Sequence, residues 1–279
     1  MPATQIGQNL AFINWTVLTG LALGTYAAVI LLRERTTATS GYLVFTTACA
    51  IGFGVLAYLS DQALPASLGD SPVVIDPAWD GPRQMALGAF IALVSAALLL
   101  RRVHLGVATV CAWLGLTAGL ATLVFGALAW GGGGLGNAAL LVQLGVLAAG
   151  IGGFFAAMIL GHWYLVTPKL PESPLILLTR VLVAVMAAQV VLFAFWTATG
   201  AGPADVAPFA ALVGPWALFV WLRLLVGLVF PLIVSVASVR TASTRSMESA
   251  TGLLYINVGS VAAGTILAAG LYFGAGLLV

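Results

Sequence analysis

Charged residues are scarce in this chain. Asp, Glu, Lys and Arg make up only 6% of its 279 residues, whereas hydrophobic residues make up 62%. Soluble domains contain about 25% charged residues, so a surface this poor in charge excludes an ordinary water-soluble protein. Nucleic-acid binding is also excluded, because the formal net charge is only +2 and comes from arginines in short loops. We therefore expect the protein to reside in a membrane.

Residues that would identify a familiar reaction are also missing. The sequence contains no Walker motif, nucleophile elbow or His-Glu-x-x-His zinc motif. Lys169 is the only lysine and lies between two apolar runs, which excludes a retinal-type Schiff base. No Asp or Glu lies inside an apolar run, so a carboxylate-based ion pump is not expected. Cys49 and Cys111 both fall within such runs and cannot form a disulfide framework. Whether the protein is an enzyme therefore stays open.

Long apolar runs dominate what is present. Most exceed the ~20 residues that a helix needs to cross ~30 Å of hydrocarbon. They are continuously apolar, whereas barrel strands would alternate polar and apolar residues. The sequence thus predicts an all-α, polytopic membrane protein forming one integral membrane domain of eight transmembrane helices. The expected spans are 10–32, 41–60, 84–100, 105–130, 138–165, 174–199, 214–239 and 250–278.

The distribution of cations predicts the orientation. Seven of the ten lie in loops on one side of the membrane, namely Arg33, Arg35, Arg101, Arg102, Lys169, Arg240 and Arg245. The other side has only Arg83, while Arg180 and Arg223 fall within spans. By the positive-inside rule the side with seven cations is cytoplasmic, so both termini are expected outside. We expect a multi-pass protein of the plasma (cytoplasmic, or inner) membrane.

One connecting segment is longer than the rest. Residues 61–83 contain four prolines and four aspartates and are expected outside, as a solvated cap. The alternatives are a docking surface for an external protein subunit or, less favoured because the spacing of a calcium loop is absent, a weak cation site built from carboxylates. Trp15, Trp130, Trp196 and Trp216 lie at the outer ends of spans and are interpreted as an interfacial aromatic belt.

A faint internal repeat relates the two halves of the chain. Residues 22–32 and 151–161 share glycine, alanine and leucine positions at an offset of 129, so span 1 would correspond to span 5. This predicts two parallel four-helix halves. Pairs of glycines four residues apart at 20/24, 115/119 and 270/274 predict close helix packing.

Arg223 is the strongest candidate for a ligand-binding residue. It lies nine residues into its span, where a charge costs roughly 2.5–3.5 kcal/mol on insertion scales. Without an acid at that depth, it needs a protein partner or a ligand. The protein partners are a carbonyl, an amide such as Gln143 or Gln189, a Tyr or Ser hydroxyl, or Asp205 reached directly or through water. The ligands are a lipid phosphate, a carboxylate, a haem propionate or a quinone oxygen. Arg180 lies about 9 Å from the nearer membrane surface, where its side chain can extend back to water.

A second candidate site contains the two histidines of the chain. His162 and Tyr164 lie at the cytoplasmic end of span 5 and could hydrogen-bond a quinone head group. A haem or metal between His104 and His162 is the less favoured alternative, because His104 lies in a basic loop rather than inside the membrane. Asn257 enters span 8 from the same side and either faces the same cavity or packs against a neighbouring helix.

Three hypotheses for the function remain open. The first is a quinone-interacting membrane anchor of a redox complex, with external or cytoplasmic partner subunits and membrane lipid around it. Small polytopic anchors of bacterial nitrite and dimethyl-sulfoxide reductases provide an analogy of architecture only, with no shared residue motif. The second is a transporter or channel for a small anion or lipid-like molecule, with Arg223 as the anion site. The third is a non-catalytic scaffold. Candidate ligand-binding residues are Arg223, His162, Tyr164, Gln189, Asn257 and Arg180.

Overall fold

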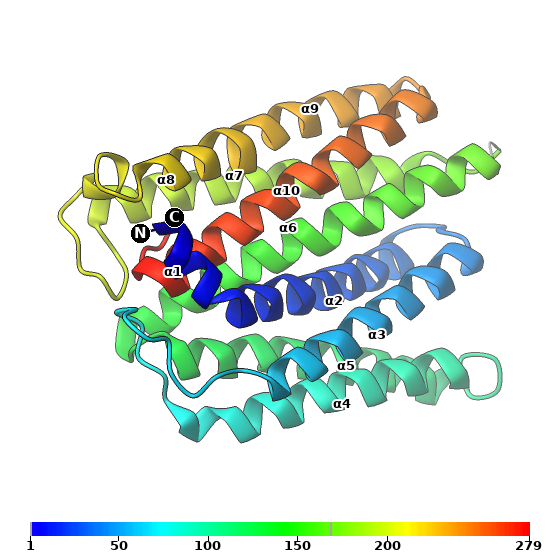
Figure 1. Ribbon diagram of the computed structural model, residues 1–279. Coiled ribbons are helices and arrows are strands. Elements are labelled where there is room, and N and C mark those ends of the chain that lie inside the picture. Colours follow the sequence, from blue (N-terminus) through cyan, green and yellow to red (C-terminus); the bar gives the residue numbers. More distant parts are fainter. Residues whose placement is uncertain (1, 168) are drawn as a thin grey trace.

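The computed structural model describes residues 2–167 and 169–279, and it confirms the all-helical fold (Figure 1). The elements are α1 (Pro2–Gln8), α2 (Leu10–Arg35), α3 (Ser40–Gln62), η1 (Pro77–Trp79), α4 (Asp80–Leu100), α5 (Leu105–Trp130), α6 (Gly134–Val166), α7 (Ser173–Thr199), η2 (Ala210–Leu212), α8 (Ala217–Leu224), η3 (Leu225–Val229), α9 (Phe230–Ser243) and α10 (Met247–Ala275). The described residues form no strand.

Eight of these segments are long and apolar enough to cross a membrane, as predicted. The third begins earlier than residue 84, because η1 and the first turn of α4 extend it to Pro77–Leu100. The seventh runs over Ala217–Ser243 but is built from α8, the π-helical segment η3 and α9. The protein is therefore a multi-pass membrane protein with one interrupted span.

The helices run side by side, so the connecting segments gather at two ends of the bundle (Figure 1). We call the end that holds both chain termini the termini end. The opposite end, which holds Arg33, Arg101, Arg102 and Arg245, is called the arginine end. The predicted sidedness of the membrane corresponds to these two ends, with the arginine end expected in the cytoplasm.

Helices α2 and α6 form the centre of the bundle. In each, 72% of the most apolar 18-residue window is buried, against 28–39% in the other six spans. Their backbones touch: a Cβ on Gly24 would lie 1.8 Å from the carbonyl oxygen of Ala148, and a Cβ on Gly152 would lie 2.3 Å from the Thr25 nitrogen. Only glycine permits this approach, which provides close van der Waals contact between helices in lipid.

The remaining helices are arranged around this pair in two similar sets. Helix α3 packs on α2, and α4 packs on α3 and α5. In the second half α7 packs on α6, and α9 packs on α7 and α10. The last helix of each half also contacts the central helix of the other, since α5 packs on α6 and α10 packs on α2. This reciprocal arrangement agrees with the two parallel halves that the sequence repeat predicts.

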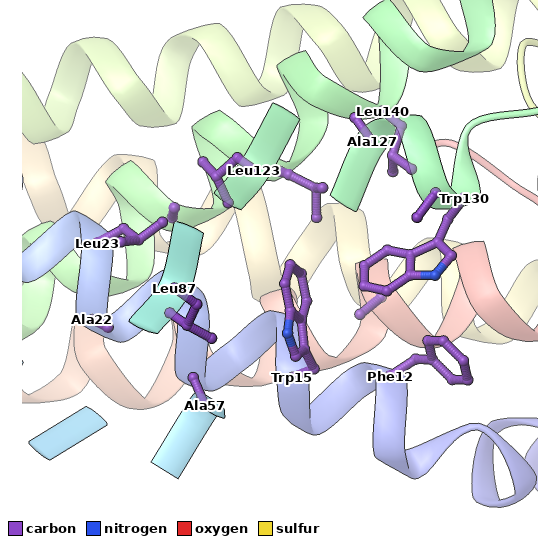
Figure 2. Close-up of a cluster of buried hydrophobic side chains, with 14 of the residues drawn as sticks. Phe12, Trp15, Ala22, Leu23, Ala57, Leu87, Leu123, Ala127, Trp130 and Leu140 are labelled. Atoms are coloured by element: carbon purple, nitrogen blue, oxygen red, sulfur yellow. The ribbon is translucent and has the colours of Figure 1, made fainter. Parts of the chain in front are cut away.

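The predicted aromatic belt is wrong for three of its four tryptophans. Trp15 and Trp130 are 0% and 1% exposed, and Trp196 is 8% exposed. Figure 2 shows Trp15 of α2 and Trp130 of α5 together with Phe12 inside the core, and the two indole rings meet edge to face with centroids 4.7 Å apart. The sequence places these residues at the ends of spans, but their helix faces point inward rather than toward lipid.

Candidate functional site

The guanidinium of Arg223 is enclosed by protein. The side chain lies in the last turn of α8 and is 1% exposed. Its Nη2 donates to Oε1 of Gln189 on α7 at 2.8 Å, and its Nη1 donates to the Gly227 carbonyl at 3.4 Å. Gln189 is one of the two amides that the sequence offered as partners. Arg223 forms no salt bridge with any described residue, and its Nε has no hydrogen-bond partner among them.

Two glycines make room for this side chain. A Cβ on Gly264 of α10 would lie 2.9 Å from Nη1 of Arg223 and 2.6 Å from the Gly227 Cα. The Gln189 amide is fixed as well, because its Nε2 donates to the Val146 carbonyl at 3.0 Å. The guanidinium therefore lies at the contact between η3 and α10 and faces a fixed acceptor.

Pro231 explains why polar side chains gather at this level. Proline has no N–H, so it leaves a carbonyl unbonded whether the helix follows α-helical or π-helical spacing. The α-helical partner would be Gly227, and the π-helical partner would be Val226. Arg223 donates to the Gly227 carbonyl and the Ser260 hydroxyl donates to the Val226 carbonyl. Side chains thus satisfy both of the carbonyls that an N–H at position 231 could have bonded, as a helix inside a membrane requires.

Asn257 extends the same network by one turn. Its Nδ2 donates to the Pro231 carbonyl at 3.3 Å and to the Ser235 hydroxyl at 3.0 Å. Asn257 is fully buried, and its Oδ1 has no partner among the described residues. Arg223, Gln189, Ser260, Asn257 and Ser235 therefore form one buried polar cluster around the broken span, which we call the Pro231 cluster.

The other predicted site residues lie elsewhere. His162, Arg180 and His104 are exposed, on α6, on α7 and just before α5. Tyr164 is buried, and its hydroxyl donates to the Pro171 carbonyl at 2.5 Å, which fastens the segment after α6 to the bundle. The structure joins Arg223 directly to Gln189 and places Asn257 nearby. It does not place His162 or Tyr164 among the partners of this cluster.

A buried ion pair that the sequence did not predict lies near the termini end. Asp61 and Arg83 were expected at the limits of a solvated cap, but they lie within α3 and α4 and are 2% and 1% exposed. Arg83 Nε and Nη2 donate to Asp61 Oδ2 and Oδ1 at 2.7 and 3.2 Å, and Trp15 Nε1 donates to Oδ2 at 2.6 Å. Arg83 also bonds the half-exposed Asp80 at 2.8 Å and lies 4.7 Å from the Trp130 ring centroid.

Two cavities with mainly apolar walls lie outside these clusters. The termini-end cavity has a volume of about 800 Å³ and lies between the glycine turn before α6, the end of α7 and the end of α10. Its walls include the aromatic side chains Phe195, Trp196 and Tyr272. The arginine-end cavity has a volume of about 470 Å³ and lies between α2, α3, α4 and α5. Arg223 borders neither cavity.

No metal centre is evident in the described part of the chain. Its residues contain no group of three or more His, Cys, Asp or Glu placed to hold a metal ion. The less favoured alternative from the sequence, a haem between His104 and His162, is not tested by this observation.

Comparison with known proteins leaves the geometry as the only guide to function. No protein-family model, no curated protein and no solved structure matches this chain. The fold and the eight spans identify it as an all-helical, multi-pass membrane protein.

Proposed function

We propose that this protein is a membrane subunit that binds a quinone, or a chemically similar ring-and-tail lipid, in the termini-end cavity. The observation that carries the proposal is the cavity of about 800 Å³, which lies within the roughly 300–1,000 Å³ typical of small-molecule sites. Such sites are lined mainly by apolar and aromatic side chains with few polar groups. The walls here follow that composition.

The surroundings of the cavity suit a ligand that arrives through lipid. Leu135, Val142 and Phe195 line it and are 89%, 44% and 53% exposed. In a membrane these side chains would face acyl chains, so an apolar tail could remain in the bilayer while the ring enters. An aqueous substrate would gain little from such an entrance.

Trp196 supplies a polar group for orienting the ring. It lines the cavity, and its buried indole N–H has no hydrogen-bond partner among the described residues. A buried, unpaired donor costs about 1–3 kcal/mol, and a ligand carbonyl would recover that cost. Neighbouring atoms cover this nitrogen, so the acceptor reaches it only after a shift of Trp196 or of the adjacent Phe195, whose ring centroid is 4.9 Å away. In a redox complex, partner subunits docked at the bundle ends would exchange electrons with this quinone.

A non-catalytic scaffold is the second candidate. The Pro231 cluster favours it, because Arg223, Asn257 and Ser260 donate to carbonyls of the interrupted span, which is a structural role. Two observations weigh against the small-anion transporter: Gln189 and Gly227 each accept a hydrogen bond from the Arg223 guanidinium, and Arg223 borders neither cavity.

The test compares two tryptophan substitutions. Ala138 lines the cavity, so Ala138→Trp should fill it, whereas Ala92 is an exposed residue of α4 that does not line it. Each variant and the parent would be purified in detergent and their lipid extracts analysed for quinone by absorbance after chromatography. Binding of a short-chain quinone would be followed by quenching of tryptophan fluorescence.

We expect quinone in the extracts of the parent and of Ala92→Trp, and at least a tenfold loss of affinity in Ala138→Trp. Extracts without quinone, together with unquenched fluorescence, would favour the scaffold. Equal binding by both variants would place the ligand outside this cavity.

A further inference from the structure

The arginine-end cavity combines a cationic mouth with an apolar interior. The cavity is lined by Arg33 from the end of α2 and by Arg101 and Arg102 from the turn after α4. These residues come from two separate parts of the chain. The positive-inside rule explains why cations lie at this end of the bundle, but not why three of them border a single cavity.

The positive charge at this mouth is only partly balanced. Arg33 bonds the Glu34 carboxylate at 2.7 Å, with both side chains partly exposed. Arg101 donates to the Ser40 hydroxyl at 2.9 Å, and Arg102 is exposed. Neither Arg101 nor Arg102 forms a salt bridge with any described residue. Two of the three cations at the mouth therefore have no anionic partner among the described residues.

The corresponding end of the second half provides an internal comparison. A cavity there is bordered by Arg245 and by Glu248. Arg245 also bonds the Glu172 carboxylate at 3.2 Å. Carboxylates thus accompany the cation in the second half, whereas Arg101 and Arg102 have none in the first.

A helix terminus adds to the attraction for an anion. Ser40, which lines the arginine-end cavity, is the first residue of the 23-residue helix α3. The first amide groups of a helix lack partners within it, and the helix dipole is positive at this end. Arginines and helix N-termini are both groups that bind phosphate in proteins.

The interior of the cavity is suited to a hydrocarbon chain. Val29, Leu43 and Leu98 line it, and it extends to Tyr26, whose hydroxyl is already bonded to the Ala112 carbonyl at 3.1 Å. Tyr26 lies seven residues before Arg33, so the cavity reaches about 10 Å along α2 at ~1.5 Å per residue. Free phosphate would leave this apolar depth unused.

We propose that the arginine-end cavity binds the phosphate of an anionic lipid, with Arg101 and Arg102 at the phosphate and an acyl chain between α2, α3, α4 and α5. Basic pockets between transmembrane helices on the cytoplasmic side are a recognised way of binding anionic head groups. This site is separate from the termini-end cavity, so it does not depend on the proposed quinone.

The test measures lipid retention by the intact chain. The protein, purified in a neutral detergent, is incubated with dioleoyl phosphatidylglycerol or dioleoyl phosphatidylcholine, and retained lipid is counted by native mass spectrometry. The variant Arg101→Gln/Arg102→Gln is compared with Arg240→Gln/Arg245→Gln, which removes the same charge from the same end. Ala97→Phe fills the apolar part of the cavity and leaves its arginines unchanged.

We expect phosphatidylglycerol to be retained in preference to phosphatidylcholine. Each arginine near the membrane surface strengthens binding of an anionic lipid about fivefold, so Arg101→Gln/Arg102→Gln should weaken that binding about thirtyfold. The charge-matched control should weaken it by no more than about threefold. Ala97→Phe should also weaken lipid binding. Equal losses in both arginine variants, or equal retention of both lipids, would overturn the site.

A last comparison separates a lipid from free phosphate. If 10 mM inorganic phosphate displaces phosphatidylglycerol, and Ala97→Phe binds that lipid normally, the ligand is a soluble phosphate and the lipid proposal is wrong. If phosphate does not compete and Ala97→Phe binds weakly, the acyl chain contributes to recognition as proposed.

Discussion

Replacing Asp61 by Asn should destabilise the fold, because its carboxylate accepts three hydrogen bonds in a buried place. Two come from Arg83 and one from the Trp15 indole, at 2.6–3.2 Å. Hydrogen bonds to a charged group contribute about 1.5–3 kcal/mol, against about 0.5–1.5 kcal/mol for neutral ones. The asparagine side chain keeps one oxygen, which is neutral and accepts more weakly from two of the donors. Its NH₂ group cannot accept, so the third hydrogen bond is lost.

The expected loss for Asp61→Asn is about 3 kcal/mol, at the lower end of the 3–5 kcal/mol that breaking a buried ion pair costs. Arg83 retains one carboxylate, Asp80, which keeps the loss at that lower end. Asp80→Asn removes the partner whose side chain is 42% exposed, so it should cost no more than about 1 kcal/mol. Both substitutions replace a carboxylate that bonds Arg83, and the two carboxylates differ in burial.

The assay is unfolding of the purified protein in mixed micelles of increasing denaturing-detergent content, followed by tryptophan fluorescence. Asp61→Leu/Arg83→Met serves as a second control, because an apolar pair of similar volume replaces the ion pair. It should lose only about 1 kcal/mol, the cost of leaving the Trp15 N–H unpaired. The reasoning is refuted if Asp61→Asn costs no more than Asp80→Asn.

Further outcomes follow from the packing and the orientation. Gly24→Ala should destabilise the protein by more than 3 kcal/mol, since its Cβ would lie 1.8 Å from a carbonyl oxygen of α6, whereas Gly52→Ala meets no atom within 4 Å and should be neutral or stabilising by up to about 1 kcal/mol in the same assay. Arg223→Met should cost about 2 kcal/mol in the parent and about 1 kcal/mol less in a Pro231→Ala background, where an N–H again competes for the carbonyl; additive losses in the double-mutant cycle would contradict this. An engineered cysteine within residues 63–76 should react with a membrane-impermeant thiol reagent added outside intact cells, and protection there would reverse the predicted topology.

Sequence patterns predicted the bundle because a bilayer imposes few solutions on a chain. Continuous apolar runs must be helical in lipid, and their number and approximate limits follow from length alone. The contact between Arg223 and Gln189 could also be anticipated, since both residues lie deep in spans that contain no acid. Which side chains satisfy the carbonyls near Pro231 depends on the helix face that meets α10, and composition does not specify that face.

Asp61 and Arg83 show where such reasoning fails. Both lie at the boundary between an apolar run and a polar segment, so they resemble residues that face water. Their burial depends on two other helices: the Trp15 and Trp130 rings lie against the Arg83 guanidinium, and the Trp15 N–H bonds Asp61. The termini-end and arginine-end cavities could not be predicted from the sequence either, since each is bounded by elements from distant parts of the chain.

The touching backbones of Gly24 and Gly152 restrict how anything could cross the bundle. At that level the middle of the molecule is filled by main-chain atoms that no side-chain rotation can move aside. A conduit along the central axis would require α2 and α6 to separate and lose the contact on which their packing is based. A molecule that crosses this protein would have to pass within one half of the bundle or along its outer helices, not between α2 and α6.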